Sequence, residues 1–143
     1  MTIESILRKK GSAVERITPS ASLKAAIDRM RAKNISALLV AQGDAIVGIL
    51  AERDILQALS QHTRSPEALQ VEDAMSHELI TVLPEDSVRH AMGLMTRHRV
   101  RHLPVIRDGV LLGIVSIGDV VKSRLDQIEY EAHSMRSFIA GAA

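Results

Sequence analysis

Two related stretches decide the fold of this chain, and they read Gly48-Ile49-Leu50-Ala51-Glu52-Arg53-Asp54-Ile55 and Gly113-Ile114-Val115-Ser116-Ile117-Gly118-Asp119-Val120. Each begins with an aliphatic run that is typical of a strand. Each then reaches an Asp where the first turn of a following helix is expected, and an acidic residue is favourable there. The two stretches lie 113 − 48 = 65 positions apart, which indicates an internal repeat.

The repeat extends well beyond these stretches, because residues 17–56 align with residues 82–121 without a gap. Nine of these forty pairs are identical, whereas chance would give roughly two or three, so one supersecondary unit occurs twice. The identical pairs are Pro19/Pro84, Ser22/Ser87, Ala26/Ala91, Met30/Met95, Leu38/Leu103, Val40/Val105, Gly48/Gly113, Ile49/Ile114 and Asp54/Asp119.

Each copy carries the signals of the same five elements. A capping Ser, Ser22 or Ser87, precedes apolar residues spaced i, i+3, i+4 and i+7, which predicts a helix with one buried stripe. Two aliphatic runs then flank a turn at residues 43–44 or 108–109, as in a β-hairpin. With a short leading strand near residues 14–17 or 79–82 and a second helix from about residue 52 or 117, each copy is predicted to be strand, helix, strand, strand, helix.

The predicted fold class is α+β. Because one three-stranded sheet cannot bury both of its faces alone, we expect the copies to pack together with pseudo-twofold symmetry. Residues 1–62 should hold the first copy with an N-terminal segment, 63–76 a connector, 77–125 the second copy and 126–143 a C-terminal helical tail. Met30, Met92 and Met95 are predicted core residues. Gly48 and Gly113 are predicted to lie where the last strand passes close to its neighbours.

The repeated stretches, together with Arg101-His102-Leu103-Pro104-Val105 and Asp73-Ala74-Met75-Ser76, resemble cystathionine β-synthase (CBS) domains. The resemblance covers nearly the whole chain and implies a stand-alone tandem pair, or Bateman module. It also implies a regulatory module whose ligands are adenosine compounds such as AMP, ADP, ATP, NAD(H) or S-adenosylmethionine, bound in clefts between the two repeats.

The resemblance assigns roles to particular residues. Asp119 would hold the ribose hydroxyls and Ser116 would lie near phosphate. Arg101, His102 and Pro104 would edge the adenine and phosphate. The further candidates for nucleotide binding are Thr81 and Val82 against the base, Ile117 and Arg99 in the second copy, and Asp54, Arg53, Ser36 and Ala37 in the first.

These residue types suit the ligand chemically. The two oxygens of a carboxylate match the paired 2′ and 3′ hydroxyls of a ribose, and the helix that Ser116 opens offers N–H groups to a phosphate. Arg99 and Arg101 could add charge-assisted contacts to phosphate oxygens. Without aromatic residues nearby, adenine would lie between aliphatic walls such as Val82 and Ile117.

A purely structural alternative is a capping box, in which Ser116 and Asp119 only satisfy N–H groups at the helix start. The first copy favours ligand binding, because Asp54 is present although Ala51 cannot cap. Ala51 also departs from the family pattern, with Arg53 as a candidate to compensate. We therefore expect unequal sites, the second binding a phosphorylated adenosine more tightly.

Composition argues against several other functions. A net charge of +1 and 1% aromatic residues disfavour nucleic-acid binding, although residues 97–102 form a short basic run. There is no Cys, and we find no catalytic triad, so no enzyme, required cofactor or metal is predicted. His98 and His102 have a metal-ligand spacing, but a helix end near Arg99 should separate their rings. No segment reads as a signal peptide or membrane span, which predicts a cytoplasmic protein without membrane contact.

The tail has apolar residues in a heptad-like spacing. They are Val121, Leu125, Ile128, Ala132, Met135 and Ile139. The tail helix could lie on its own module or against a second chain, and we expect a homodimer with these helices at or near the interface. The predicted function is a regulatory sensor of adenine nucleotides, AMP first, that signals energy or redox state to an unknown partner protein. The alternative is a ligand-free dimeric scaffold.

Overall fold

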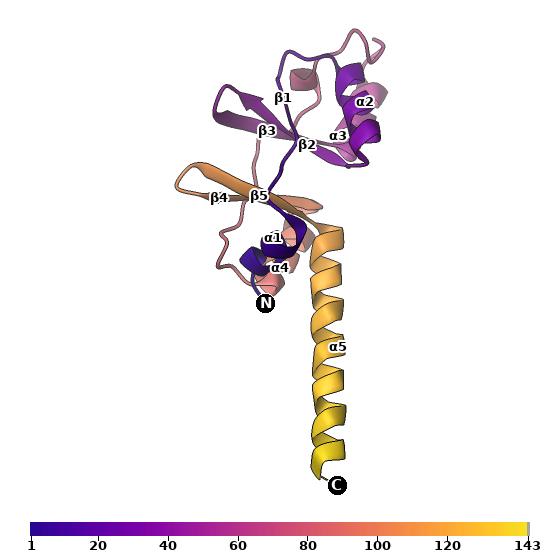
Figure 1. The fold of residues 1–143 in the computed structure, drawn as a ribbon. Helices are drawn as coiled ribbons and strands as arrows, with labels where there is room; N and C mark the ends of the chain where they lie inside the picture. The colour runs from indigo at the N-terminus through magenta and orange to yellow at the C-terminus, as the bar shows by residue number, and fades with distance from the viewer. Residues whose placement is uncertain (143) are drawn as a thin grey trace. The chain divides into compact units, whose positions relative to one another are not determined.

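The computed structural model describes residues 1–142 and divides the chain into two compact units. The first-repeat unit comprises Ala13–Leu79. The second-repeat unit comprises Met1–Ser12 together with the chain from Ile80 onward (Figure 1). The α+β class and the two copies of the predicted unit are confirmed.

The first-repeat unit is a three-stranded sheet covered by helices. Its elements are β1 (Arg16–Ile17), α2 (Leu23–Lys33), β2 (Ala37–Gln42), β3 (Ala45–Ala51), α3 (Glu52–Gln61) and the 3-10 helix η1 (Val71–Asp73). The strand order is β1-β2-β3, with β1 parallel and β3 antiparallel to β2. Leu38 and Val40 of β2 form one apolar core with the buried residues of α2 and α3 and with Leu69 and Val71, so the predicted connector contributes to this unit.

The second-repeat unit repeats this plan with one strand fewer. Its elements are α1 (Ile3–Lys10), α4 (Val88–His98), β4 (His102–Arg107), β5 (Val110–Ser116) and α5 (Ile117–Ala142). The strand predicted near residues 79–82 is reduced to a single parallel bridge between Val82 and Val105. It is held by hydrogen bonds from Val82 N to Pro104 O and from Ile106 N to Val82 O, both 3.1 Å.

The predicted helix caps and hairpins are confirmed in both copies. The hydroxyl of Ser22 accepts a hydrogen bond from Ala25 N, and that of Ser87 accepts one from His90 N. Each hydroxyl thereby satisfies an N–H that would otherwise lack a partner at the helix start. The hairpins turn at positive φ, through Gly43 in the first copy and through Asp108 and Gly109 in the second.

The equivalent glycines of the two copies are close-contact positions, as predicted, but different segments cross them. A Cβ atom on Gly48 would lie 2.6 Å from the backbone oxygen of Ser76. That residue pairs with Ile49 through hydrogen bonds of 3.0 and 2.9 Å. A Cβ atom on Gly113 would instead lie 2.7 Å from Cδ2 of Leu7 in α1.

The N-terminal helix α1 belongs to the second-repeat unit, whereas the sequence prediction grouped residues 1–62 together. Its residues Ile3 and Ile6 are buried in the same core as Val88, Ala91 and Met95 of α4. Glu4 N also donates to Pro84 O at 2.8 Å. The segment that precedes the first copy in sequence therefore completes the core of the second copy.

Two further expectations concern exposure. The core assignment of Met92 is wrong, because its side chain is 38% exposed at the edge of the buried stripe of α4. The predicted tail helix is confirmed, since α5 runs without a break from the second repeat to Ala142. Its heptad residues Leu125, Ile128, Met135 and Ile139 are exposed.

Within residues 1–142, no helix combines the length and apolar character needed to cross a membrane.

Candidate functional site

The first turn of α5 brings together the two residues that the sequence singled out, Ser116 and Asp119. The carboxylate oxygen Oδ2 of Asp119 accepts a hydrogen bond from Ser116 N at 2.8 Å, and Asp119 N donates to Ser116 Oγ at 3.1 Å. These two bonds form the capping box that the sequence left open as an alternative. The cap fixes the carboxylate at a helix N-terminus, and it does not exclude a ligand.

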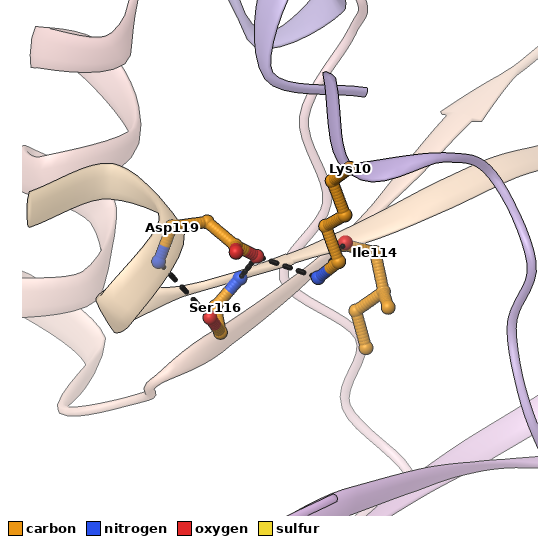
Figure 2. A network of polar contacts seen from close by, with 4 residues as sticks. All are labelled: Lys10, Ile114, Ser116 and Asp119. Carbon is orange, nitrogen blue, oxygen red and sulfur yellow. Dashed lines mark hydrogen bonds and ion pairs between the residues drawn. The ribbon is translucent and has the colours of Figure 1, made fainter. Parts of the chain in front are cut away.

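A third residue joins this pair, and sequence reasoning missed it. The ammonium group of Lys10 lies 2.5 Å from Asp119 Oδ2 and donates to the carbonyl oxygen of Ile114 at 2.9 Å (Figure 2). Lys10 is the last residue of α1 and lies 109 positions before Asp119. An ion pair between residues so far apart leaves no periodic signal in one sequence, so no pattern could have found it.

The surroundings of Asp119 favour its ionised form. Burial raises the pKa of its carboxyl, but the ammonium of Lys10 and the N–H and hydroxyl of Ser116 outweigh burial, so the pKa lies below its usual value. At neutral pH the site therefore holds a carboxylate paired with a lysine. Both side chains stay partly accessible, with 24% of Asp119 and 33% of Lys10 exposed.

His102 at the start of β4 and Arg101, which precedes the strand, are two more predicted residues beside this helix start. His102 pairs with Ser116 in the β4–β5 register, and Arg101 O accepts a hydrogen bond from Ile117 N at 2.8 Å. The side chains of Arg101 and Ile117 are exposed, with Ile117 45% accessible. The structure thus gathers these four residues and Asp119 at one end of the β4–β5 hairpin.

The remaining candidates of the second copy are Arg99, Val82, Pro104 and Thr81. Arg99 caps the C-terminus of α4 in a left-handed conformation. Val82 and Pro104 are joined by the backbone bond described above, and Thr81 next to them is exposed. Val82 is only 2% exposed and packs in the apolar core, so the aliphatic wall expected from its side chain is not presented to a ligand.

The first copy has the same backbone arrangement with a weaker cap. Ser36 O accepts a hydrogen bond from Glu52 N at 3.2 Å, and Ala37, which is buried, pairs with Ala51. Asp54 Oδ2 accepts a hydrogen bond from Ala51 N at 2.8 Å. Capping therefore does explain Asp54, contrary to the sequence prediction, because half of a capping box needs no side chain at residue 51.

The pKa of the Asp54 carboxyl is shifted in the opposite direction from that of Asp119. Burial raises the pKa of the Asp54 carboxyl, and the Ala51 N–H and the charge of Arg53 offset that effect only in part. The carboxylate of the first copy is therefore less stabilised by its surroundings than the carboxylate of the second.

The histidine pair His98 and His102 is divided between a helix and a strand. His98 ends α4 and His102 begins β4, so the two residues lie on different elements, as predicted. Across the described part of the chain, no group of three or more His, Asp or Glu side chains is arranged to hold a metal ion.

Comparison with known proteins agrees with this architecture. The sequence matches the family model of the CBS domain twice, over residues 5–61 and 71–126. It is 36% identical to the mitochondrial CBS domain-containing protein CBSX3 of Arabidopsis thaliana, in a match that covers 98% of this chain and 72% of the relative. A solved structure of a protein with CBS domains from Burkholderia ambifaria MC40-6 has 40% identity and a TM-score of 0.85, and the match covers 88% of this chain and 95% of that one.

One more distant structure contains ligands. The CBS domain pair of protein MJ0100, solved in complex with 5′-methylthioadenosine and S-adenosyl-L-methionine, is 24% identical to this chain with a TM-score of 0.75. The match covers 90% of this chain and 98% of that one. At this identity the likeness concerns the fold.

Proposed function

The chain belongs to the CBS-domain family, with two copies of the domain, and on that premise we propose that it is a regulatory module whose second copy binds an adenine nucleotide at Ser116 and Asp119. The observation that carries the proposal is the ionised, partly exposed carboxylate of Asp119 at the start of α5. Carboxylate oxygens accept hydrogen bonds from the two hydroxyls of a ribose.

The groups around that carboxylate suit the rest of a nucleotide. The N-terminus of α5 attracts a phosphate, and the guanidinium of Arg101 and the ammonium of Lys10 can pair with phosphate oxygens. The exposed side chain of Ile117 offers an apolar surface to the base. AMP is the ligand we favour, with ADP, ATP and NAD(H) as the other candidates, and the adenosine compounds bound by MJ0100 agree with this class.

The two copies should bind unequally. Ser116 supplies a hydroxyl next to the phosphate position, whereas Ala51 in the first copy has none, and the pKa of Asp54 is raised where that of Asp119 is lowered. We assign the tighter site to the second copy, because it offers the Ser116 hydroxyl together with a carboxylate whose ionised form is favoured by its surroundings. Binding there would change the conformation of the module and so a surface that a partner protein recognises.

Isothermal titration of AMP against the wild-type chain and its Asp119→Ala and Asp54→Ala variants tests this assignment. We expect Asp119→Ala to weaken binding at least about tenfold, the effect of losing hydrogen bonds to a charged acceptor. Asp54→Ala should change the tighter affinity by less than about threefold. Equal losses in both variants would contradict the asymmetry, and no binding of AMP, ADP, ATP or NAD(H) by the wild-type chain would contradict the function.

A second candidate role concerns assembly, and the exposed face of α5 favours it. Leu125, Ile128, Met135 and Ile139 share the heptad-like spacing and are exposed. We propose that two chains associate through this face into a homodimer. Light scattering at micromolar concentration should give twice the mass of 15.6 kDa, and a monomer would contradict it.

The proposal assigns no catalysis to the chain, and it leaves a ligand-free dimeric scaffold as the competing function. A thermal-shift panel of adenosine compounds separates the two, since a ligand at about 100 times its Kd adds roughly 2.7 kcal/mol of stability. A nucleotide sensor shows such a shift and a scaffold shows none. Turnover of ATP or NAD(H) by the pure protein would instead indicate an enzyme.

A further inference from the structure

Lys10 occupies the position at which the proposed site would receive a ribose. Its ammonium and the Ser116 N–H both use Oδ2 of Asp119, at 2.5 and 2.8 Å (Figure 2). A sugar diol that pairs with this carboxylate must share or replace the Lys10 contact. Ligand binding at Asp119 is therefore coupled to the loss or weakening of the contact between Asp119 and the ammonium of Lys10.

The charges around Lys10 favour a particular class of ligand. A small pocket of about 110 Å³ in the second-repeat unit is lined by the charged residues Lys9, Lys10, Lys122, Asp119 and Asp126. Their formal charge is 3 − 2 = +1, and it stays positive when the carboxylate of Asp119 accepts hydrogen bonds from a ribose. An uncharged ligand leaves this positive charge in place and a cationic ligand adds to it, whereas a phosphate carries about −1.5 to −2 charges and offsets it.

The geometry lets Lys10 change partners without leaving the site. Its second contact, to the carbonyl oxygen of Ile114 at 2.9 Å, does not involve Asp119 and can persist when the carboxylate turns to a ligand. Lys10 ends α1, and its flexible four-carbon stem lets the ammonium move a few ångströms at little cost. The pocket is smaller than the roughly 300–1,000 Å³ of complete small-molecule sites, so it suits one group of the ligand.

We propose that Lys10 is a specificity-determining residue that pairs with Asp119 in the free protein and transfers to the 5′-phosphate of a bound adenosine nucleotide. This inference rests on the proposed function and deepens it. It selects phosphorylated adenosines over adenosine itself and over sulfonium or thioether adenosines, which carry no 5′-phosphate.

Titrations of AMP and adenosine against the wild-type full chain and Lys10→Met test the proposal. In the variant, Asp119 loses its competitor, so adenosine binds several-fold tighter, while AMP loses its phosphate partner and binds at least about tenfold more weakly. The preference for AMP over adenosine therefore falls more than tenfold. Lys10→Arg, which keeps a charged donor, should restore most of this preference.

Lys24→Met is the matched control, because Lys24 is also ion-paired, with Asp28 at 2.6 Å, but lies in the first-repeat unit. It removes the same charge and should leave both affinities unchanged. Far-UV circular dichroism checks that each variant is folded. An unchanged AMP preference in Lys10→Met, or an equal change for both ligands, would overturn the role of Lys10 alone. No binding of AMP, ADP, ATP or NAD(H) to the wild-type chain would overturn the proposed function as well.

Discussion

The two copies of the repeat share a backbone plan but are completed by different parts of the chain. In the first copy, the segment that follows it in sequence returns to the unit, so that Ser76 pairs with Ile49 and Val71 enters the core. In the second copy, helix α1 from the start of the chain fills that role and brings Lys10 to Asp119. A duplicated unit can thus acquire unequal sites without losing its own motif, because the difference comes from what packs against it.

Substitutions of the equivalent glycines, Gly48 and Gly113, should show the largest difference in stability between the two copies. Gly48→Ala should lower the free energy of unfolding by about 3 kcal/mol, because the new methyl group meets the backbone oxygen of Ser76, and the two backbone hydrogen bonds between Ser76 and Ile49 hold that residue in place. Gly113→Ala should cost only about 1 kcal/mol, because the end of the flexible Leu7 side chain can move.

Urea unfolding followed by far-UV circular dichroism measures both variants, since the chain has no Trp. Gly93→Ala in α4 is the control: nothing lies within 4 Å of the added atom, so it should be neutral or raise stability by up to about 1 kcal/mol. A larger loss of stability for Gly113→Ala than for Gly48→Ala would contradict the contacts described, Ser76 at Gly48 and Leu7 at Gly113.

The ion pair between Lys10 and Asp119 in the second copy should give the next largest difference in stability. Asp119→Asn keeps an acceptor for the Ser116 N–H but removes the charge that pairs with Lys10, and it should cost about 1 kcal/mol at pH 7. Asp54→Asn should leave stability unchanged or raise it by a few tenths of a kcal/mol, because burial there disfavours the charge that is removed.

A double-mutant cycle isolates the pairwise contribution. The cycle of Lys10→Met with Asp119→Asn should give a coupling energy of about 1 kcal/mol. A cycle on the Arg8 and Glu4 pair, which is well exposed on the same helix, should give only about 0.3 kcal/mol. Equal coupling energies in the two cycles would argue against a special role for Lys10.

The pH dependence of stability should have opposite signs at the two carboxylates. Because the folded pKa of Asp119 is lowered, its stabilising contribution is complete above the unfolded value of about 3.9 and is lost as the pH falls through the folded value. Because the pKa of Asp54 is raised, its ionisation disfavours the folded state, and this penalty is absent below about pH 3.9 and grows as the pH rises through the folded value.

Urea unfolding at pH 7 and pH 3 measures this. The deficit of Asp119→Asn relative to wild type should shrink toward pH 3, and any advantage of Asp54→Asn should disappear there. A deficit of Asp119→Asn that stays constant between the two pH values would contradict the lowered pKa.

The smallest expected effect comes from making the first cap resemble the second. Ala51→Ser supplies the hydroxyl that Ser116 has, completes a capping box with Asp54 and should raise the free energy of unfolding by about 0.5 kcal/mol. The reciprocal Ser116→Ala should lower it by about 1 kcal/mol. A loss of stability on Ala51→Ser would indicate that the helix starts of the two copies differ in geometry.

Local patterns in the sequence predicted the local structure of both copies. The capping serines at residues 22 and 87 and the glycine turns act within a few residues, so one sequence contains their full signal. Met92 was misassigned because the spacing of apolar residues finds the stripe of a helix but not its edge. The strand expected near residues 79–82 is only a single bridge at Val82, because pairing with a distant strand decides how far a strand extends.

The site was predictable only where it lies within one stretch of sequence. Ser116 and Asp119 are three positions apart, and the register of the hairpin brings His102 beside them. Lys10 was not predictable, because its position depends on the packing of α1 against the second copy, and that contact spans most of the chain. The pseudo-twofold packing of the copies and the clefts between them stay predictions.

A crystal structure of the full chain grown with AMP would show whether Asp119 and Lys10 bind the nucleotide as proposed. We expect the ribose hydroxyls on the carboxylate of Asp119, the phosphate near Ser116 and the ammonium of Lys10 moved from Asp119 to a phosphate oxygen. Density for AMP elsewhere, with Lys10 still 2.5 Å from Asp119, would contradict it.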